Sequence, residues 1–156
     1  MQTKNTMVIK AAFLILILAT LGFIFSQSML PPEKSEQQSN SVGEIVAEVI
    51  PPDTKPGEFV QINLRKLAHF FEFAVLGIEL SVYAFVFKRR KGFMLSTYIF
   101  AVFVALFDET IQIFSGRGSS IFDVWIDFFG FAAAASLVYL IGFSVIFIRG
   151  KWCKNG

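Results

Sequence analysis

The sequence predicts an all-α integral membrane protein, an antiparallel bundle of four transmembrane helices with a short amphipathic helix in its outer loop. The chain has 156 residues, of which 54% are hydrophobic and 20 are phenylalanine, and its mean hydropathy is +0.61. This is well above an ordinary soluble domain. Four apolar runs, 7–26, 67–87, 92–114 and 121–148, are each near the roughly 20 residues that a spanning helix needs. They are too long, and alternate too little, for barrel strands of about 9–11 residues.

Basic residues at three places set the orientation of these spans. They precede the first run, join the second to the third at 88–91, and follow the fourth; the individual residues at the two ends are Lys4, Lys10, Arg149, Lys151 and Lys154. No acidic residue lies among them. By the positive-inside rule all three places face the cytoplasm. We therefore expect one domain, 1–156, with both termini inside and residues 27–63 forming an extracytoplasmic loop.

The first run also has a second interpretation. Its basic start, apolar core and Ser26-x-Ser28 resemble a secretory signal, and cleavage there would leave three spans. We favour a retained span, because the run exceeds the about 7–15 residues usual in a signal core.

The outer loop changes character along its length. The stretch PPEKSEQQSNS is polar and predicted to be mobile, and PPDTKPG is a Pro/Gly-rich stop. Between them, residues 41–50 place apolar side chains at helical spacing opposite Glu44 and Glu48. This pattern predicts a short amphipathic helix that packs on the other spans or binds a partner. Its apolar face comprises Val42, Ile45, Val46, Val49 and Ile50.

Ionisable residues enter the later three runs at one level, near their outer ends. From Gly92 to Phe107 the helix rises about 24 Å, at about 1.5 Å per residue, so Asp108 lies at the outer edge of a core about 30 Å thick. The same count puts Asp127 and His69 at that depth. Three helices therefore present polar side chains close to the outer surface.

Spacing determines which of these side chains share a face. Four residues of the second span form one stripe, and two i,i+4 pairs follow on the third and fourth spans; these are Lys66, His69, Glu72 and Glu79, then Asp108 with Gln112, and Asp123 with Asp127. Ionisable groups are costly in lipid unless paired or hydrated, so the stripes should face the bundle interior. Glu79 lies deepest, and we expect it to be protonated or hydrogen-bonded to a neighbouring helix. Close helix approach is predicted at three pairs of small residues, Ala101/Ala105, Gly77/Ser81 and Gly130/Ala134.

Three of these residues have structural alternatives. Residues 120–123 resemble a capping box, so Asp123 either caps the fourth span or belongs to a site. Arg117 either neutralises Asp108 or Asp123, or holds an anion at the start of that span. His69 is either a satisfied interfacial residue or a proton carrier.

The polar motifs of the last three spans form a distinctive combination: Lys66-x-x-His69-Phe70-x-Glu72-Phe73, Leu76-Gly77, Asp108-Glu109-x-x-Gln112-x-Phe114, Gly116-Arg117 and Asp123-x-x-x-Asp127-x-x-Gly130. From about residue 64 to 135 the chain resembles the VanZ-like family of small bacterial membrane proteins. The resemblance implies four helices in the bacterial plasma membrane and a role in the cell envelope, one named member being linked to low-level teicoplanin resistance. It supplies no established reaction. Phe73 stands where tyrosine is frequent, and Ser115 where proline is usual, so a tyrosine-dependent mechanism is not carried over.

Three functional hypotheses follow. The first is a ligand site at the outer leaflet for an amphipathic envelope component or a lipophilic glycopeptide, formed by Lys66, His69, Glu72, Asp108, Glu109, Gln112, Arg117, Asp123 and Asp127. The second is an enzyme acting on a lipid-linked envelope precursor, with acid/base candidates His69, Glu72, Asp108 and Glu109 or a divalent metal held by such groups. The third is proton-coupled transport along the stripe to Glu79. No nucleophile elbow or full metal motif is present, so no cofactor or metal is predicted. Membrane lipids are the expected partners, nucleic acid is not, and no oligomeric state is predicted.

Overall fold

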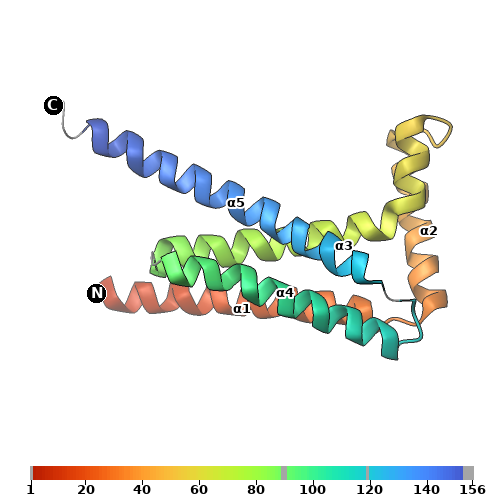
Figure 1. Cartoon of the computed structure of the whole chain (residues 1–156), viewed down its shortest axis with the longest axis horizontal. Helices are drawn as coiled ribbons and strands as arrows, with labels where there is room; N and C mark the ends of the chain where they lie inside the picture. The colour runs from red at the N-terminus through yellow and green to blue at the C-terminus, as the bar shows by residue number, and fades with distance from the viewer. Residues whose placement is uncertain (1, 89–90, 119, 153–156) are drawn as a thin grey trace.

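The computed structural model describes residues 2–88, 91–118 and 120–152, and in that part of the chain every regular element is a helix (Figure 1). The elements are α1 (Gln2–Ser28), α2 (Pro32–Val49), α3 (Lys55–Tyr83), a π-helical segment η1 (Ala84–Lys88), α4 (Lys91–Phe114) and α5 (Ile121–Trp152). Four helices are long and apolar enough to cross a membrane: α1, α3 with η1, α4 and α5. Helices suit these runs because they satisfy their own backbone hydrogen bonds where water is absent. Arg89, Arg90 and Lys154, from the predicted cytoplasmic segments, lie outside the described residues.

The four long helices run in alternating directions along one axis (Figure 1). α1, α3 and α4 contact one another, and α5 crosses α3 and then diverges toward its C-terminal end. The ring of Phe143 on α5 still packs on that of Phe85, with centroids 5.5 Å apart, but the side chains of residues 145–148 are exposed. The helices therefore pack most tightly at the end where α5 begins.

Two glycines bring α3 and α5 into backbone contact there. A Cβ atom on Gly130 would lie 2.2 Å from the carbonyl oxygen of Phe70, and one on Gly77 would lie 2.5 Å from that of Phe131. Any larger residue would force the helices apart, so the small side chains predicted for close approach are required here. This crossing lies within one helical turn of His69 and Asp127, and it fixes the distance between them.

The buried core continues from the crossing across α3, α4 and α5. Phe73, Leu76, Ala101, Ala105 and Phe131 are fully buried. The outward faces of the long helices carry many exposed large apolar side chains, which a soluble monomer rarely shows over such an area. The exposed surface is thus of the kind that contacts lipid.

The segment between α1 and the later spans is more ordered than its sequence predicts. α2 begins at Pro32, so the polar stretch predicted to be mobile is helical, and α3 begins at Lys55 instead of near residue 67. Proline is tolerated in the first turn of a helix, because the N–H group that it lacks would have no intrahelical partner there. Thr54 caps α3 by accepting from the Gly57 N–H at 3.2 Å. Together, α2 and the start of α3 form an arm that runs across the end of the long helices (Figure 1).

The arm is only partly covered by the rest of the chain. Gln61 Nε2 on α3 donates to the Gly43 carbonyl on α2 at 2.9 Å, which ties the two helices together. Of the predicted apolar face of α2, Val46 is partly covered whereas Ile45 and Val49 are exposed. The apolar face is therefore divided between the protein and its surroundings.

Candidate functional site

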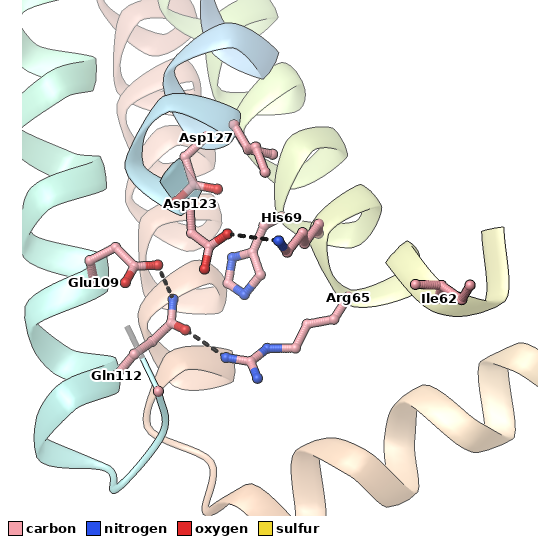
Figure 2. A pocket seen from close by; sticks show the side chains of 10 residues that line it. Ile62, Arg65, His69, Glu109, Gln112, Asp123 and Asp127 are labelled. Atoms are coloured by element: carbon pink, nitrogen blue, oxygen red, sulfur yellow. Dashed lines mark hydrogen bonds and ion pairs between the residues drawn. The ribbon is translucent and has the colours of Figure 1, made fainter. Parts of the chain in front are cut away.

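The predicted site residues lie together at the end of the long helices where α5 begins. Figure 2 shows side chains from three helices directed into one space: Arg65 and His69 from α3, Glu109 and Gln112 from α4, and Asp123 and Asp127 from α5. With Lys66, Glu72, Asp108 and Arg117 we call this set the polar cluster. Seven of its members border a cavity of about 310 Å³, namely Arg65, Lys66, His69, Glu109, Gln112, Asp123 and Asp127.

His69 lies between carboxylates of two helices. Its Nδ1 is 3.7 Å from Asp108 Oδ2 and 3.9 Å from Glu72 Oε2. The imidazole is 12% exposed, and Asp108 is completely buried. Neither distance is a hydrogen bond, and Nδ1 has no hydrogen-bond partner among the described residues. The ring is thus packed against acidic groups with one nitrogen uncommitted.

Asp108 is held from two sides. Ser28 Oγ, at the end of α1, donates to its Oδ1 at 2.5 Å, and Gln112 Nε2 donates to its Oδ2 at 2.8 Å. The amide oxygen of Gln112 in turn accepts from Arg65 Nη2 at 2.7 Å. Such a connected chain of donors and acceptors fixes the orientation of the carboxylate.

Ser28 and Arg65 were not among the predicted site residues. A spacing signal existed for Arg65, because Arg65, His69 and Glu72 stand at i, i+4 and i+7 and share one face of α3. Ser28 gave only a weak signal, as a small polar residue at the end of an apolar run. Its role depends on how α1 packs on α4, which sequence spacing does not determine.

The two acidic residues of α5 differ in their surroundings. Asp123 pairs with Lys66 at 3.5 Å, and Lys66 is 53% exposed. Asp127, one turn further, is 1% exposed, and its Oδ2 has no hydrogen-bond partner in the described part of the chain. Among the side chains that the structure describes, those of residues 4–87, 92–118 and 120–148, no lysine or arginine forms an ion pair with Asp108 or Asp127. The most buried acids are therefore those without a fixed cation.

The predicted capping box at the start of α5 is only half formed. Ser120 Oγ accepts from the Phe122 N–H at 3.2 Å, as an N-cap residue does. The Ser120 N–H, however, donates to Glu109 Oε2 of α4 at 3.3 Å, and Asp123 faces Lys66. Glu109 thus accepts the hydrogen bond from the Ser120 N–H that was predicted for Asp123. This contact links the end of α4 to the start of α5.

Arg117 is placed by the turn that ends α4. Gly116 has a positive φ of 75°, the Arg117 N–H donates to the Gln112 carbonyl and the Gly116 N–H to that of Ile113, which is the glycine-ended arrangement common at helix C-termini. No ion pair joins Arg117 to Asp108 or Asp123 in the described structure; its Nη1 instead donates to the Gln27 main-chain carbonyl at 2.8 Å. Burial, and secondarily the charge of Arg65, lower the pKa of the Arg117 guanidinium, while Asp108 and nearby glutamates oppose this.

A second cavity, of about 430 Å³, lies between α2 and α3, next to the polar cluster. Arg65 and His69 border both cavities. The second cavity also reaches Glu72 and Arg117, but most of its wall is apolar, formed by Val42, Val46, Ile50, Val60, Leu64, Leu67, Ala68 and Phe71. The side chains of Arg65 and His69 therefore belong to the walls of both a polar and a largely apolar cavity.

Glu79 lies apart from this arrangement. Its Oε1 accepts from Thr20 Oγ1 of α1 at 2.8 Å, which confirms the expectation that it is hydrogen-bonded to a neighbouring helix. The predicted stripe on α3 thus divides into a part that joins the polar cluster and a part that fastens α3 to α1.

One comparison with known proteins gives a match. A family model described as VanZ/LLP1 matches residues 13–142, most of the chain. This match extends past the motifs of residues 64–135 and includes most of α1 and all of α2. No curated protein and no solved structure matches the chain.

Proposed function

Because the chain belongs to the VanZ-like family and has four helices apolar enough to span a membrane, we propose that it binds an amphipathic cell-envelope molecule at the polar cluster. In this proposal the protein lies in the bacterial plasma membrane with both termini cytoplasmic. The polar cluster then sits at the level of the outer headgroups. The expected physiological effect is tolerance of lipophilic glycopeptide antibiotics such as teicoplanin.

The observation that carries the proposal is that a polar and a largely apolar cavity share Arg65 and His69 as wall residues. An amphipathic molecule needs both environments side by side, a polar one for its head and an apolar one for its tail. The volumes of the two neighbouring cavities, about 310 and 430 Å³, suit a headgroup and a portion of one chain.

The polar cluster holds more acidic than basic residues, but two of its cations, Arg65 and Lys66, are placed to meet an anionic group on the head. Lys66 is half exposed, and the Arg65 guanidinium is hydrogen-bonded to a neutral amide, so both can turn toward an anion without breaking an ion pair with a buried carboxylate. Arginine and lysine are the usual partners of phosphate and carboxylate groups.

A drug-susceptibility assay tests the proposal. A strain lacking the gene is complemented with wild type, His69→Ala, or Val46→Phe, which places a larger side chain in the apolar cavity. We expect wild type to raise the inhibitory concentration of teicoplanin more than it raises that of a glycopeptide without an acyl chain. Neither variant should show this difference. Ile45→Phe is the matched control, because Ile45 is on the same helix but 67% exposed.

The outcomes separate binding from a purely structural role. All variants are compared at equal membrane abundance, measured through a C-terminal tag. If His69→Ala and Val46→Phe at normal abundance protect as well as wild type, the proposed binding site is wrong. If protection falls only in step with abundance, the polar cluster serves packing alone.

A second candidate function is catalysis on a lipid-linked envelope precursor, favoured by the placement of His69 between the carboxylates of Glu72 and Asp108. The corresponding test incubates purified protein in nanodiscs with a lipid-linked precursor and follows product formation by mass spectrometry. Turnover by wild type that is lost in His69→Ala supports this candidate, and absence of turnover with bound precursor removes it.

A further inference from the structure

We infer that His69, Asp108 and Asp127 form a binding site for a divalent metal ion at the deep end of the polar cavity. One donor atom from each residue lies within 4.8 Å of the other two, although the three come from α3, α4 and α5. Metal bonds to imidazole nitrogen and carboxylate oxygen are about 2.0–2.2 Å, which sets neighbouring ligand atoms roughly 3–4 Å apart. The three atoms therefore lie within about 1–2 Å of that spacing.

Two of the three residues have a potential metal-ligand atom that forms no hydrogen bond within the described chain. Asp127 Oδ2 and His69 Nδ1 both lack a hydrogen-bond partner among the described residues, and the Asp127 side chain is 99% buried, its exposure being 1%. Buried polar atoms are usually satisfied, because an unmade hydrogen bond costs free energy. A metal ion held between them would satisfy both at once.

The charges around the three residues also favour a bound cation. None of the nearby cations forms an ion pair with Asp108 or Asp127 in the described structure: Lys66 pairs with Asp123, Arg65 hydrogen-bonds to the Gln112 amide, and Arg117 Nη1 donates to the Gln27 carbonyl. This leaves Asp108 and Asp127 buried side by side without a fixed positive charge in the described chain. A divalent cation supplies the charge that two buried carboxylates require.

The surroundings of the three residues resemble those of metal ligands in proteins, which are held in place by outer hydrogen-bond partners. Ser28 and Gln112 hydrogen-bond to the Asp108 carboxylate and fix its direction, as outer partners of metal ligands do. Glu72 Oε2 also lacks a partner in the described chain and lies 3.9 Å from His69 Nδ1, at the edge of the three-residue group.

One imidazole with carboxylates favours Zn²⁺ or Mn²⁺ over the all-oxygen preferences of Mg²⁺ and Ca²⁺. His69 and Asp127 border the polar cavity, so positions of the ion left open by the protein face that space. An anionic head entering the cavity can complete the coordination. The metal site does not depend on the envelope ligand, and the two proposals fail in different experiments.

The test uses the full-length protein purified in detergent, stripped with EDTA and dialysed. Metal content before stripping is measured by mass spectrometry, and binding of Zn²⁺, Mn²⁺ and Co²⁺ is measured by calorimetry. Co²⁺ additionally reports its ligands through its visible absorption. The variants are His69→Gln and Asp127→Asn, and the matched control is Glu79→Gln, which removes a buried carboxylate from α3 outside the polar cluster.

We expect wild type and Glu79→Gln to bind about one ion per chain with similar affinity, and each ligand variant to bind about 100-fold more weakly or worse. The Co²⁺ spectrum should change in His69→Gln, because a nitrogen ligand is lost. Variants are used only if they elute as a single monodisperse species. If neither does, the wild-type Co²⁺ spectrum decides, since imidazole ligation is visible there. Failure of wild type to bind any of the three ions up to millimolar concentration overturns the proposal, as does equal binding by a folded Asp127→Asn.

Discussion

Replacing Gly130 by alanine should disturb both stability and the site, because the α3–α5 crossing has no room for a methyl group. The new Cβ would lie 2.2 Å from the Phe70 carbonyl oxygen and 3.0 Å from its carbonyl carbon. Nonbonded heavy atoms settle roughly 3.5 Å apart, so the two helices must separate by about 1 Å at this point. Overpacking of this kind costs about 1–3 kcal/mol.

The expected change in melting temperature follows from that cost. For a chain of this size each kcal/mol shifts Tm by about 2–4 °C, so Gly130→Ala should unfold about 2–12 °C below wild type. Thermal unfolding in detergent, followed by circular dichroism or by loss of a monodisperse elution peak, measures this. Gly22→Ala is the control, because a Cβ there meets nothing within 4 Å.

The same substitution should widen the site. His69 precedes Phe70, and Asp127 lies one turn before Gly130, so a separation of about 1 Å at the crossing is passed to both side chains. The affinity for Zn²⁺ or Mn²⁺ should fall with the stability, and the control should retain both. If Gly130→Ala has the same melting temperature as wild type and Gly22→Ala, the tight crossing does not exist in the folded protein. The placement of His69 beside Asp127 then loses its main support.

Three further results are expected. Ser28→Ala removes the donor to the buried Asp108 carboxylate and should cost about 1–3 kcal/mol in thermal unfolding, whereas Ser26→Ala, at an exposed hydroxyl, should change stability by less than about 0.5 kcal/mol. Thr20→Val removes the hydrogen bond to Glu79 within the spans and should cost about 0.6 kcal/mol, the average for such bonds between membrane helices; no change would show that the contact is not made in lipid. A fluorescent-protein fusion at the C-terminus should be bright and an alkaline phosphatase fusion inactive, and the reverse result would refute the cytoplasmic C-terminus.

Helix spacing alone predicted the long helices and the level of the acidic residues. Apolar length located the spans, and the rise per residue put His69, Asp108 and Asp127 at one depth, which agrees with their approach to within 4.8 Å. These features depend on the local periodicity of one helix at a time. The start of α2 was missed because its polar residues lack an apolar period, although Glu, Lys and Gln are good helix formers.

Other features depend on contacts between elements, which spacing does not determine. Glu109 caps the start of α5 in place of Asp123, and Arg117 reaches back to the end of α1 instead of pairing with an acid. In the first case a carboxylate from another helix replaced the local one, and in the second a backbone carbonyl replaced the expected acid. Motifs identify which residues gather, and tertiary packing decides how they pair.

Arg65 is where the proposed ligand and the proposed metal would influence each other. It borders both cavities, and its bond to Gln112 continues to Asp108, so an anion that recruits the guanidinium would free the Gln112 amide next to the metal ligands. Coupling of this kind is reciprocal: the factor by which the anion changes the affinity for the metal equals the factor by which the metal changes the affinity for the anion. Arg65→Gln, which keeps a donor for Gln112 but loses the charge, should therefore abolish protection against teicoplanin while changing metal affinity only a few-fold. A loss of metal affinity as large as that in Asp127→Asn would show instead that Arg65 maintains the metal ligands, and that the two cavities act as one site.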